Sequence, residues 1–181
     1  MEELNIEEPI GKYFQLRDLI YSDIGVELGI NNMPGIDGNQ SQIIESLRAL
    51  MTNVVDIIGD THSDLIITSA FRCKELNAEI GGSVKSQHVW GEAVDLQVPS
   101  LTSAQLYNWI YNHTPFDHLI WEYPETKTDS WVHVSYSMFR NPQRRRTSLA
   151  SLASAHHNVY GGVRRGDKDR YQDGIELAKI V

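Results

Sequence analysis

Apolar residues recur at helical spacing in the first third of the chain. Residues 13–28 have this spacing and predict a short helix. Residues 29–38 contain Pro34 and three glycines, a composition typical of a connecting loop. A second helix is predicted over residues 40–58, because its apolar positions trace one face: Ile43, Ile44, Leu47, Leu50, Met51, Val54 and Ile57.

Shorter apolar runs predict strands in the middle of the chain. Residues 65–70 and 93–98 fit buried strands, with a short helix over 74–80 between them. Thr102 or Ser103 can cap a helix that runs to about His113. Residues 118–123 and 131–136 then alternate as two strands joined by a polar loop, which predicts a hairpin. The fold class is therefore α+β, with helices packed on a small antiparallel sheet.

The pattern weakens after residue 139, and the charge changes sign there. Residues 140–181 hold nine Lys and Arg against four Asp and Glu, a net charge of +5. Residues 1–139 hold seven against twenty, a net charge of −13. We therefore predict a domain over 1–139 and a basic C-terminal tail over 140–181 that serves attachment, with a short helix at 149–155. The arginines at 144–146 are interpreted as a solvated or partner-facing surface.

Composition excludes several classes of protein. The 181 residues suit one domain, and the single cysteine, Cys73, excludes an internal disulfide and a thiolate zinc cluster. The acidic body argues against nucleic-acid binding, and no apolar stretch approaches the length of a membrane span. The acidic N-terminus is unlike a secretory signal, so we expect synthesis to leave the chain in the cytoplasm of the cell that makes it.

Candidate metal ligands lie around the strand at 93–98. His88 and Asp95 are seven positions apart and bracket a glycine turn that opens this strand. Asp95 alternates with apolar neighbours, and a desolvated carboxylate needs a partner, which a zinc ion shared with His88 would supply. Catalytic zinc usually has three protein ligands, and His133, in mid-strand between two valines, offers the third.

A general base is also available. Glu122, at the end of the preceding strand, could stand across the hairpin from His133. A carboxylate beside a zinc-activated water is what hydrolysis by general-base catalysis needs. Taken singly, each of these residues also has a structural interpretation, because a strand histidine is often a hydrogen-bonded core residue and a buried aspartate is often a cap or an ion-pair partner.

Three motifs together resemble a known family. Ser-Ala-Phe-Arg ends at Arg72, Ser-x-His-x-x-Gly-x-Ala-x-Asp runs from Ser86 to Asp95, and Trp-Val-His-Val-Ser surrounds His133. This set resembles the zinc D-Ala-D-Ala carboxypeptidase family (metallopeptidase family fifteen, subfamily A), which shares its fold with the hedgehog signalling domain. Many members are bacteriophage cell-wall lysins. The likeness spans roughly residues 13–136 and does not reach the tail.

The resemblance implies roles for individual residues. It implies His88, Asp95 and His133 as zinc ligands and Glu122 as the catalytic base. It also implies that Arg72 binds a substrate carboxylate or the scissile carbonyl, and that Ser86 lies in the substrate site or against the ligands.

Two positions depart from the family pattern. Some relatives place the base three residues before the last histidine, where this chain has Ser130 next to Asp129, so Asp129 remains an alternative to Glu122. His118 stands where glutamine is expected. The other histidines show no partner pattern and are interpreted as surface residues: His62, His113, His156 and His157. No histidine arrangement makes Cys73 a convincing nucleophile.

Two functional hypotheses follow. The first is a zinc peptidase that cuts peptidoglycan stem peptides at the bacterial cell wall, either as a D,D-carboxypeptidase or as an L-alanyl-D-glutamate endopeptidase, in the manner of a phage lysin. The second is a structural component of a phage particle that keeps the fold and docks to virion subunits through its tail. Fold alone does not decide between them, so the site must.

Overall fold

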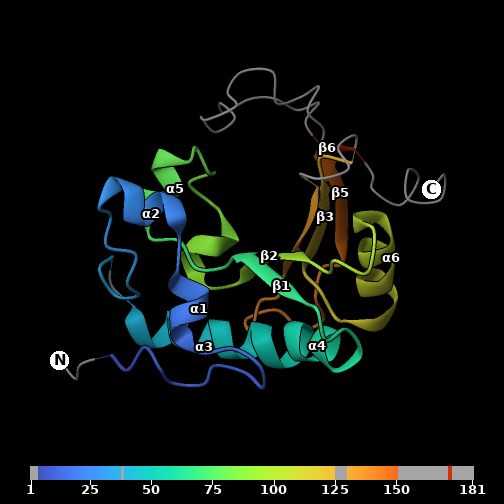
Figure 1. Ribbon diagram of the computed structural model, residues 1–181, viewed down its shortest axis with the longest axis horizontal. Coiled ribbons are helices and arrows are strands. Elements are labelled where there is room, and N and C mark those ends of the chain that lie inside the picture. The colour runs from blue at the N-terminus through green and yellow to red at the C-terminus, as the bar shows by residue number, and fades with distance from the viewer. Residues whose placement is uncertain (1–3, 38, 125–129, 151–170, 173–181) are drawn as a thin grey trace.

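Helices surround a central sheet in the computed structural model, which describes residues 4–37, 39–124, 130–150 and 171–172 (Figure 1). The α-helices, in chain order, are α1 (Leu16–Ile20), α2 (Asp23–Leu28), α3 (Gln40–Leu50), α4 (Asp56–Thr61), α5 (Lys74–Glu79) and α6 (Ser103–His113). The strands are β1 (Ile66–Ser69), β2 (Ala93–Gln97), β3 (His118–Glu122), β4 (Trp131–Ser135), β5 (Arg146–Ala150) and β6 (Tyr171–Gln172). The α+β class predicted from the sequence is confirmed.

The first predicted helix is divided in two. Tyr21 is extended, and the hydroxyl of Ser22 accepts a hydrogen bond from the N–H of Gly25 at 3.1 Å, which starts α2 afresh. A serine that bonds the backbone of the third residue after it is a preferred helix N-cap. The continuous helix expected over residues 13–28 was therefore wrong, because this cap interrupts it.

The second predicted helix runs further than expected. A π-helical turn, Met51–Val55, joins α3 to α4, so helical backbone continues from residue 40 to 61. The wider turn shifts the buried face by one position, and Val55 and Ile58 are buried where the regular spacing pointed to Ile57. This helical segment runs beneath β1 and β2 in Figure 1.

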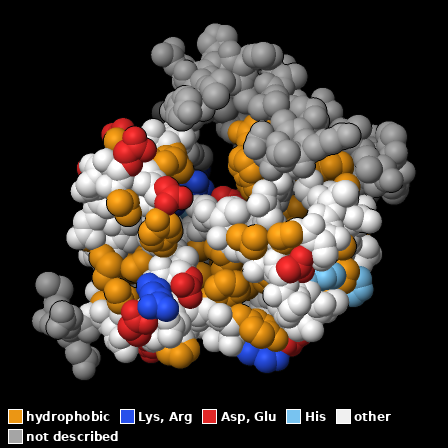
Figure 2. All heavy atoms as spheres, viewed as in Figure 1, with side chains coloured by type: hydrophobic (Ala, Val, Ile, Leu, Met, Phe, Trp, Pro, Cys, Tyr) orange, Lys and Arg blue, Asp and Glu red, His pale blue; other side chains and the backbone are white. Residues whose placement is uncertain are grey.

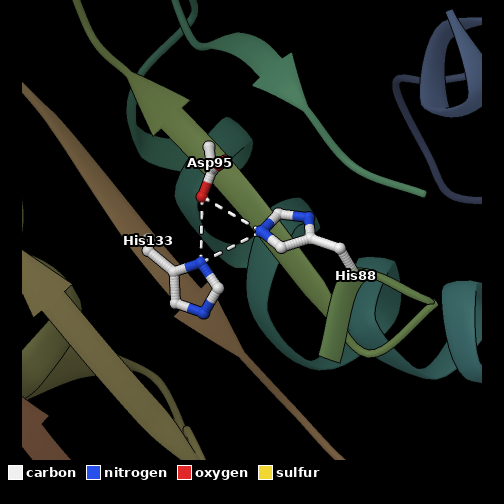
Figure 3. A group of neighbouring side chains, drawn as sticks. All are labelled: His88, Asp95 and His133. Atoms are coloured by element: carbon white, nitrogen blue, oxygen red, sulfur yellow. Dashed lines mark hydrogen bonds and ion pairs between the residues drawn. The ribbon is translucent and has the colours of Figure 1, made fainter. Parts of the chain in front are cut away.

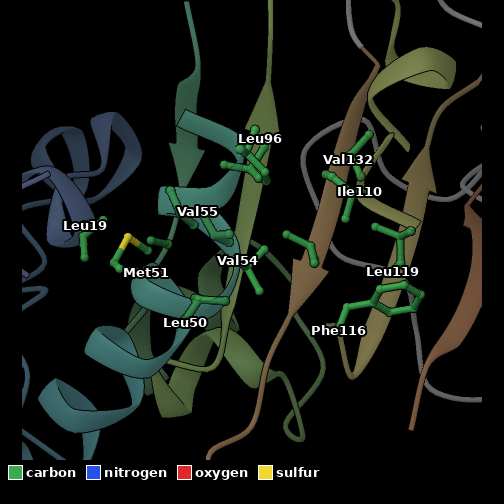
Figure 4. Close-up of a cluster of buried hydrophobic side chains, with 14 of the residues drawn as sticks. Leu19, Leu50, Met51, Val54, Val55, Leu96, Ile110, Phe116, Leu119 and Val132 are labelled. Atoms are coloured by element: carbon green, nitrogen blue, oxygen red, sulfur yellow. The ribbon is translucent and has the colours of Figure 1, made fainter. Parts of the chain in front are cut away.

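The sheet has the strand order β1-β2-β4-β3-β5-β6 in the described residues, and its pairs are antiparallel except for β3 with β5. The predicted hairpin is confirmed as β3 and β4. One face of the sheet is apolar and lies in the hydrophobic core, where Leu96, Val132 and Leu119 approach side chains of the helices (Figure 4). The other face of β2, β3 and β4 carries the polar residues singled out in the sequence.

Strand β5 extends the fold beyond the predicted domain boundary. Residues 146–150 pair in parallel with residues 118–122 of β3, and Leu149 and Ala150 are buried. The boundary expected between residues 139 and 140 therefore lies inside the fold. The helix predicted at 149–155 was wrong for Leu149 and Ala150, and residues 151–155 lie outside the described part of the chain. An attachment role for the remaining tail stays a prediction.

Two arginines of the 144–146 run have internal partners. Arg144 pairs with the buried Asp117, and Arg145 donates to the carbonyl oxygens of Tyr111 and Thr114 at the end of α6. The guanidinium of Arg145 also lies 4.3 Å from the centre of the Phe116 ring. All three arginines of the run are exposed, in agreement with the predicted solvated surface, but Arg144 and Arg145 also pair with groups of the domain itself.

Within the described part of the chain, every helix is too short or too polar to cross a membrane.

Shortening the chain tests whether residues 140–150 belong to the fold. A chain that ends at residue 139 loses β5 and leaves Asp117 without Arg140 and Arg144, and a buried carboxylate without its partner costs about 3–5 kcal/mol. We expect its melting temperature to lie roughly 10 °C or more below that of a chain ending at residue 150. Equal melting temperatures by circular dichroism would show that this segment adds nothing to the domain.

Candidate active site

His88 lies in a single 3₁₀ turn, Gln87–Trp90, that leads directly into β2. The turn ends at Gly91 with a left-handed φ of +67°, and a Cβ there would lie 2.7 Å from the carbonyl oxygen of Ile43 in α3. Only glycine lets the turn pack this closely. The His88 ring is buried, and its Nδ1 lies 2.6 Å from the carbonyl oxygen of Ala70. Since that oxygen can only accept, Nδ1 carries the proton and Nε2 presents a lone pair.

Asp95 and His133 are direct cross-strand neighbours on β2 and β4. Residues opposite one another in an antiparallel pair project to the same face. The flanking apolar residues, Val94 and Leu96 on β2 and Val132 and Val134 on β4, are fully buried on the other face. The alternation predicted for both strands is confirmed.

Three candidate ligand atoms converge at the sheet surface (Figure 3). The Nε2 of His88 lies 3.3 Å from Oδ1 of Asp95 and 3.1 Å from Nδ1 of His133. The Nδ1 of His133 lies 2.9 Å from the same Asp95 oxygen. Ligand atoms about 2.0–2.1 Å from a tetrahedral zinc ion lie roughly 3.3 Å from one another. The triangle formed by His88, Asp95 and His133 therefore fits a small divalent ion.

The protonation states suit a cation. Burial lowers the pKa of His88 to about 4, so its ring is neutral at pH 7. Burial opposes ionisation of Asp95, but the neighbouring His88 and His133 side chains outweigh it and hold the pKa of Asp95 well below its usual range. A neutral imidazole and an ionised carboxylate are the forms that bind divalent metals.

Arg72 is held beside this cluster by its backbone. Its N–H donates to the carbonyl oxygen of His88 at 3.3 Å, and its charge is among the causes that lower the pKa of His88, after burial. Asn32 braces the segment, because its side chain donates to the carbonyl of Phe71 at 3.1 Å and accepts from the N–H of Cys73 at 2.7 Å. The Nε of Arg72 is buried and has no hydrogen-bond partner among the described residues. The substrate-binding role of Arg72 stays a prediction.

Glu122 lies on the same sheet face as His133 but not directly across from it. The register pairs Glu122 with Trp131, and Ile120 stands opposite His133. Glu122 is therefore one diagonal step away, where Cα atoms in a sheet are about 7–8 Å apart. Its side chain is half-buried. A base acting through a water molecule fits this separation, and the role of Glu122 stays a prediction.

Of the two residues at the alternative position for the base, the structure describes Ser130 but not Asp129. The hydroxyl of Ser130 donates to the carbonyl of Glu122 at 2.8 Å and accepts from the indole of Trp121 at 3.0 Å. It also pairs with Ser103 of α6 at 2.7 Å, so Ser130 serves the packing of α6 against the sheet. Asp129 lies outside the described residues.

Ser86 and His118 flank the cluster in different ways. Ser86 begins the ligand turn, where its carbonyl oxygen accepts from the N–H of Val89 at 3.2 Å, and its predicted substrate role stays a prediction. His118 occupies the position where glutamine was expected, and its ring centre lies 6.3 Å from that of His133. Its Nε2 pairs at 2.8 Å with the hydroxyl of Ser148 in β5, so the segment beyond the predicted domain accommodates this histidine. Burial lowers the pKa of His118 to about 3, which keeps the ring neutral.

Three residues set aside from the sequence have local structural roles. Cys73 is buried and caps α5, with its sulfur accepting from the N–H of Leu76 at 3.4 Å. His113 is exposed, as predicted, and stacks on Trp109. His62 is only partly exposed and packs edge-on against the same indole, so the surface interpretation holds only in part. His156 and His157 lie outside the described residues.

Removing any one ligand should empty the site of metal. His88→Ala, Asp95→Ala and His133→Ala should each lower the zinc content from about one equivalent to a small fraction, since catalytic sites rely on three protein ligands. His113→Ala, an exposed histidine on α6, is the matched control and should keep full zinc. Elemental analysis of the purified variants decides the assignment, and full zinc in all three ligand variants would refute it.

Comparison with known proteins places these residues in a family. A search of curated proteins returns no match. The family model for peptidase M15 matches residues 12–135, more than half of the 181-residue chain. The matched span contains the three candidate ligands together with Arg72 and Glu122. The chain thus belongs to the peptidase M15 family.

Proposed function

We propose that this protein is a zinc-dependent peptidase that hydrolyses a peptide bond in peptidoglycan stem peptides. The observation that carries the proposal is the convergence of His88, Asp95 and His133 on one point of the sheet, at separations that suit a tetrahedral metal ion. The membership of the peptidase M15 family supports peptide hydrolysis as the reaction.

The donor set fits zinc better than the harder divalent ions. Two imidazole nitrogens and one carboxylate oxygen form a common catalytic zinc set, whereas Mg²⁺ and Ca²⁺ prefer sites made of oxygen atoms alone. A bound zinc ion would supply Lewis acidity, which polarises a peptide carbonyl and makes a neighbouring water more acidic. The bond of His88 to Ala70 orients one ligand ring, as a histidine ligand requires.

Glu122 and Arg72 supply the remaining chemistry in this proposal. Glu122, on the ligand face of the sheet, accepts the proton of the attacking water and returns it to the leaving amine. Arg72 binds a substrate carboxylate or the scissile carbonyl, since a planar guanidinium offers two parallel donors. The unpaired Nε of Arg72 supports this assignment.

Stem peptides suit this site because they carry carboxylates beside their cleavable bonds. A terminal D-Ala-D-Ala unit ends in a free carboxylate, and a D-glutamate residue linked through its side chain keeps one next to the L-alanine bond. Either group could pair with Arg72. Figure 2 shows a hollow above β2, between α5 and the part of the sheet that holds β3 and β5, with charged side chains inside it. We propose that the peptide enters the site there.

The direct test uses defined peptides and purified cell walls. We expect the full chain to cleave one of two synthetic stem peptides, one ending in D-Ala-D-Ala and one with an intact L-Ala-D-Glu bond. Cleavage should disappear with a chelator and return with added zinc. Mass spectrometry identifies the bond, and a zymogram on cell walls extends the result to the polymer. Zinc-loaded protein that cleaves neither peptide nor wall would refute the substrate assignment.

The base assignment has its own test. Glu122→Gln should keep full zinc yet lower kcat by about 10²–10⁴-fold, because the amide keeps the shape but cannot accept a proton. Asp129→Asn is the matched control and should leave kcat within a few-fold of the full value. Peptide-cleavage assays with the two zinc-loaded variants measure kcat for each. The reverse pattern, with Asp129→Asn inactive and Glu122→Gln active, would make Asp129 the base.

A further inference from the structure

The side-chain amide of Gln87, which is partly buried, links the segments that carry the two histidine ligands. Gln87 directly precedes His88, and its Oε1 accepts from the hydroxyl of Ser135 at 2.8 Å. Ser135 lies on β4, two residues after His133. The Nε2 of Gln87 donates to Glu92 and to Asp117, both at 3.1 Å. The Gln87 side chain thus ties the ligand turn to the strand that carries His133.

Two buried carboxylates hold this amide in place. Glu92 is 7% exposed and Asp117 is fully buried. The hydroxyl of Ser137 also donates to Glu92, at 2.5 Å. Burying two carboxylates against one amide group is costly unless cations lie beside them.

The cations come from the segment after the family match. Arg144 donates from Nε to Oδ1 of Asp117 at 2.8 Å, and its Nη2 pairs with Oδ2 of the same carboxylate. The Nη1 of Arg140 lies 3.2 Å from Oδ2 of Asp117 and 3.7 Å from Oε2 of Glu92, so this guanidinium pairs with both carboxylates. Such a two-pronged pair fixes the orientation of a carboxylate as well as its charge.

We propose that Arg144, supported by Arg140, is a positioning residue of the active site. Through Asp117 it holds the Gln87 amide, and through that amide it sets the separation of the His88 and His133 ligand atoms. Metal sites lose affinity when ligands shift by a fraction of an ångström, so supporting groups contribute to binding without touching the metal. The inference rests on the proposed metal site but adds residues that the family match, which ends at residue 135, does not contain.

The experiment compares two adjacent arginines in the full chain. Arg144→Gln removes the partner of Asp117. Arg145→Gln is the matched control, because its guanidinium bonds the carbonyls of Tyr111 and Thr114 and stacks near Phe116. Both substitutions remove a structural guanidinium, but only the first touches the Gln87 network. Zinc affinity is measured by competition with a chromogenic chelator, and the visible spectrum of the Co²⁺-loaded protein reports ligand geometry.

We expect Arg144→Gln to weaken zinc binding about 10–100-fold and to change the Co²⁺ spectrum. Arg145→Gln should keep zinc affinity within about threefold and preserve the spectrum, even if it lowers the melting temperature as much as Arg144→Gln does. If Arg144→Gln does not fold, Arg144→Lys is tested in its place. Lysine keeps the positive charge but cannot pair with both oxygens of Asp117 as the planar guanidinium does, so it should weaken zinc binding by roughly threefold or more.

The outcomes separate this inference from the proposed function. Wild-type protein that binds zinc, with Arg144 variants that bind it equally well, overturns the positioning role alone. Equal weakening by Arg145→Gln also overturns it, because the effect would then follow stability and not position. Wild-type protein that binds no zinc overturns the proposed function and this inference together.

Discussion

The burial of ionised carboxylates is the constraint on which this arrangement depends. Asp95 and Asp117 are 7% and 0% exposed, and a carboxylate removed from water must be matched by cations or by several donors. The ring of His133 bonds Asp95 at 2.9 Å, and Arg140 and Arg144 pair with Asp117. These partners come from distant parts of the sequence. The contacts with the two carboxylates therefore also hold together the ligand turn, the hairpin and the segment that follows it.

The pairing of β2 with β4 converts this requirement into ligand geometry. Each side chain alternates between two faces, so a slip of one residue would move Asp95 or His133 into the apolar layer and expose a valine. The apolar residues that form the core therefore also determine where the ligand atoms lie. Gly91 adds a second restriction, because only glycine lets the turn that carries His88 pack this closely against Ile43 of α3. Stability and the candidate chemistry depend on the same contacts.

Sequence alone predicted the elements whose signal is local and missed those whose cause is remote. Alternation around Asp95 and His133 was sufficient to find the strands and the face that carries both side chains. The register of Glu122 was not accessible, because it depends on the hairpin geometry that places Ile120 opposite His133. Asn32 and Gln87 escaped notice because their amides bond groups far along the chain or across strands and leave no periodic pattern. An asparagine or glutamine beside a motif residue is the only signal that could have drawn attention to them.

The charge asymmetry of the chain shows why such partners are hard to infer from sequence. An acidic body and a basic tail suggest two regions with separate functions, and the family match ends before the arginines. In three dimensions, Arg140 and Arg144 neutralise carboxylates of the acidic body, and β5 lies beside β3 in the sheet. β4 ends beside the start of β3, and the chain passes this end of β3 to begin β5 on its other side. This crossing carries Arg140 and Arg144 to Asp117. Part of the positive charge is therefore needed inside the domain, and a division of charge along the sequence is not a division of function in space.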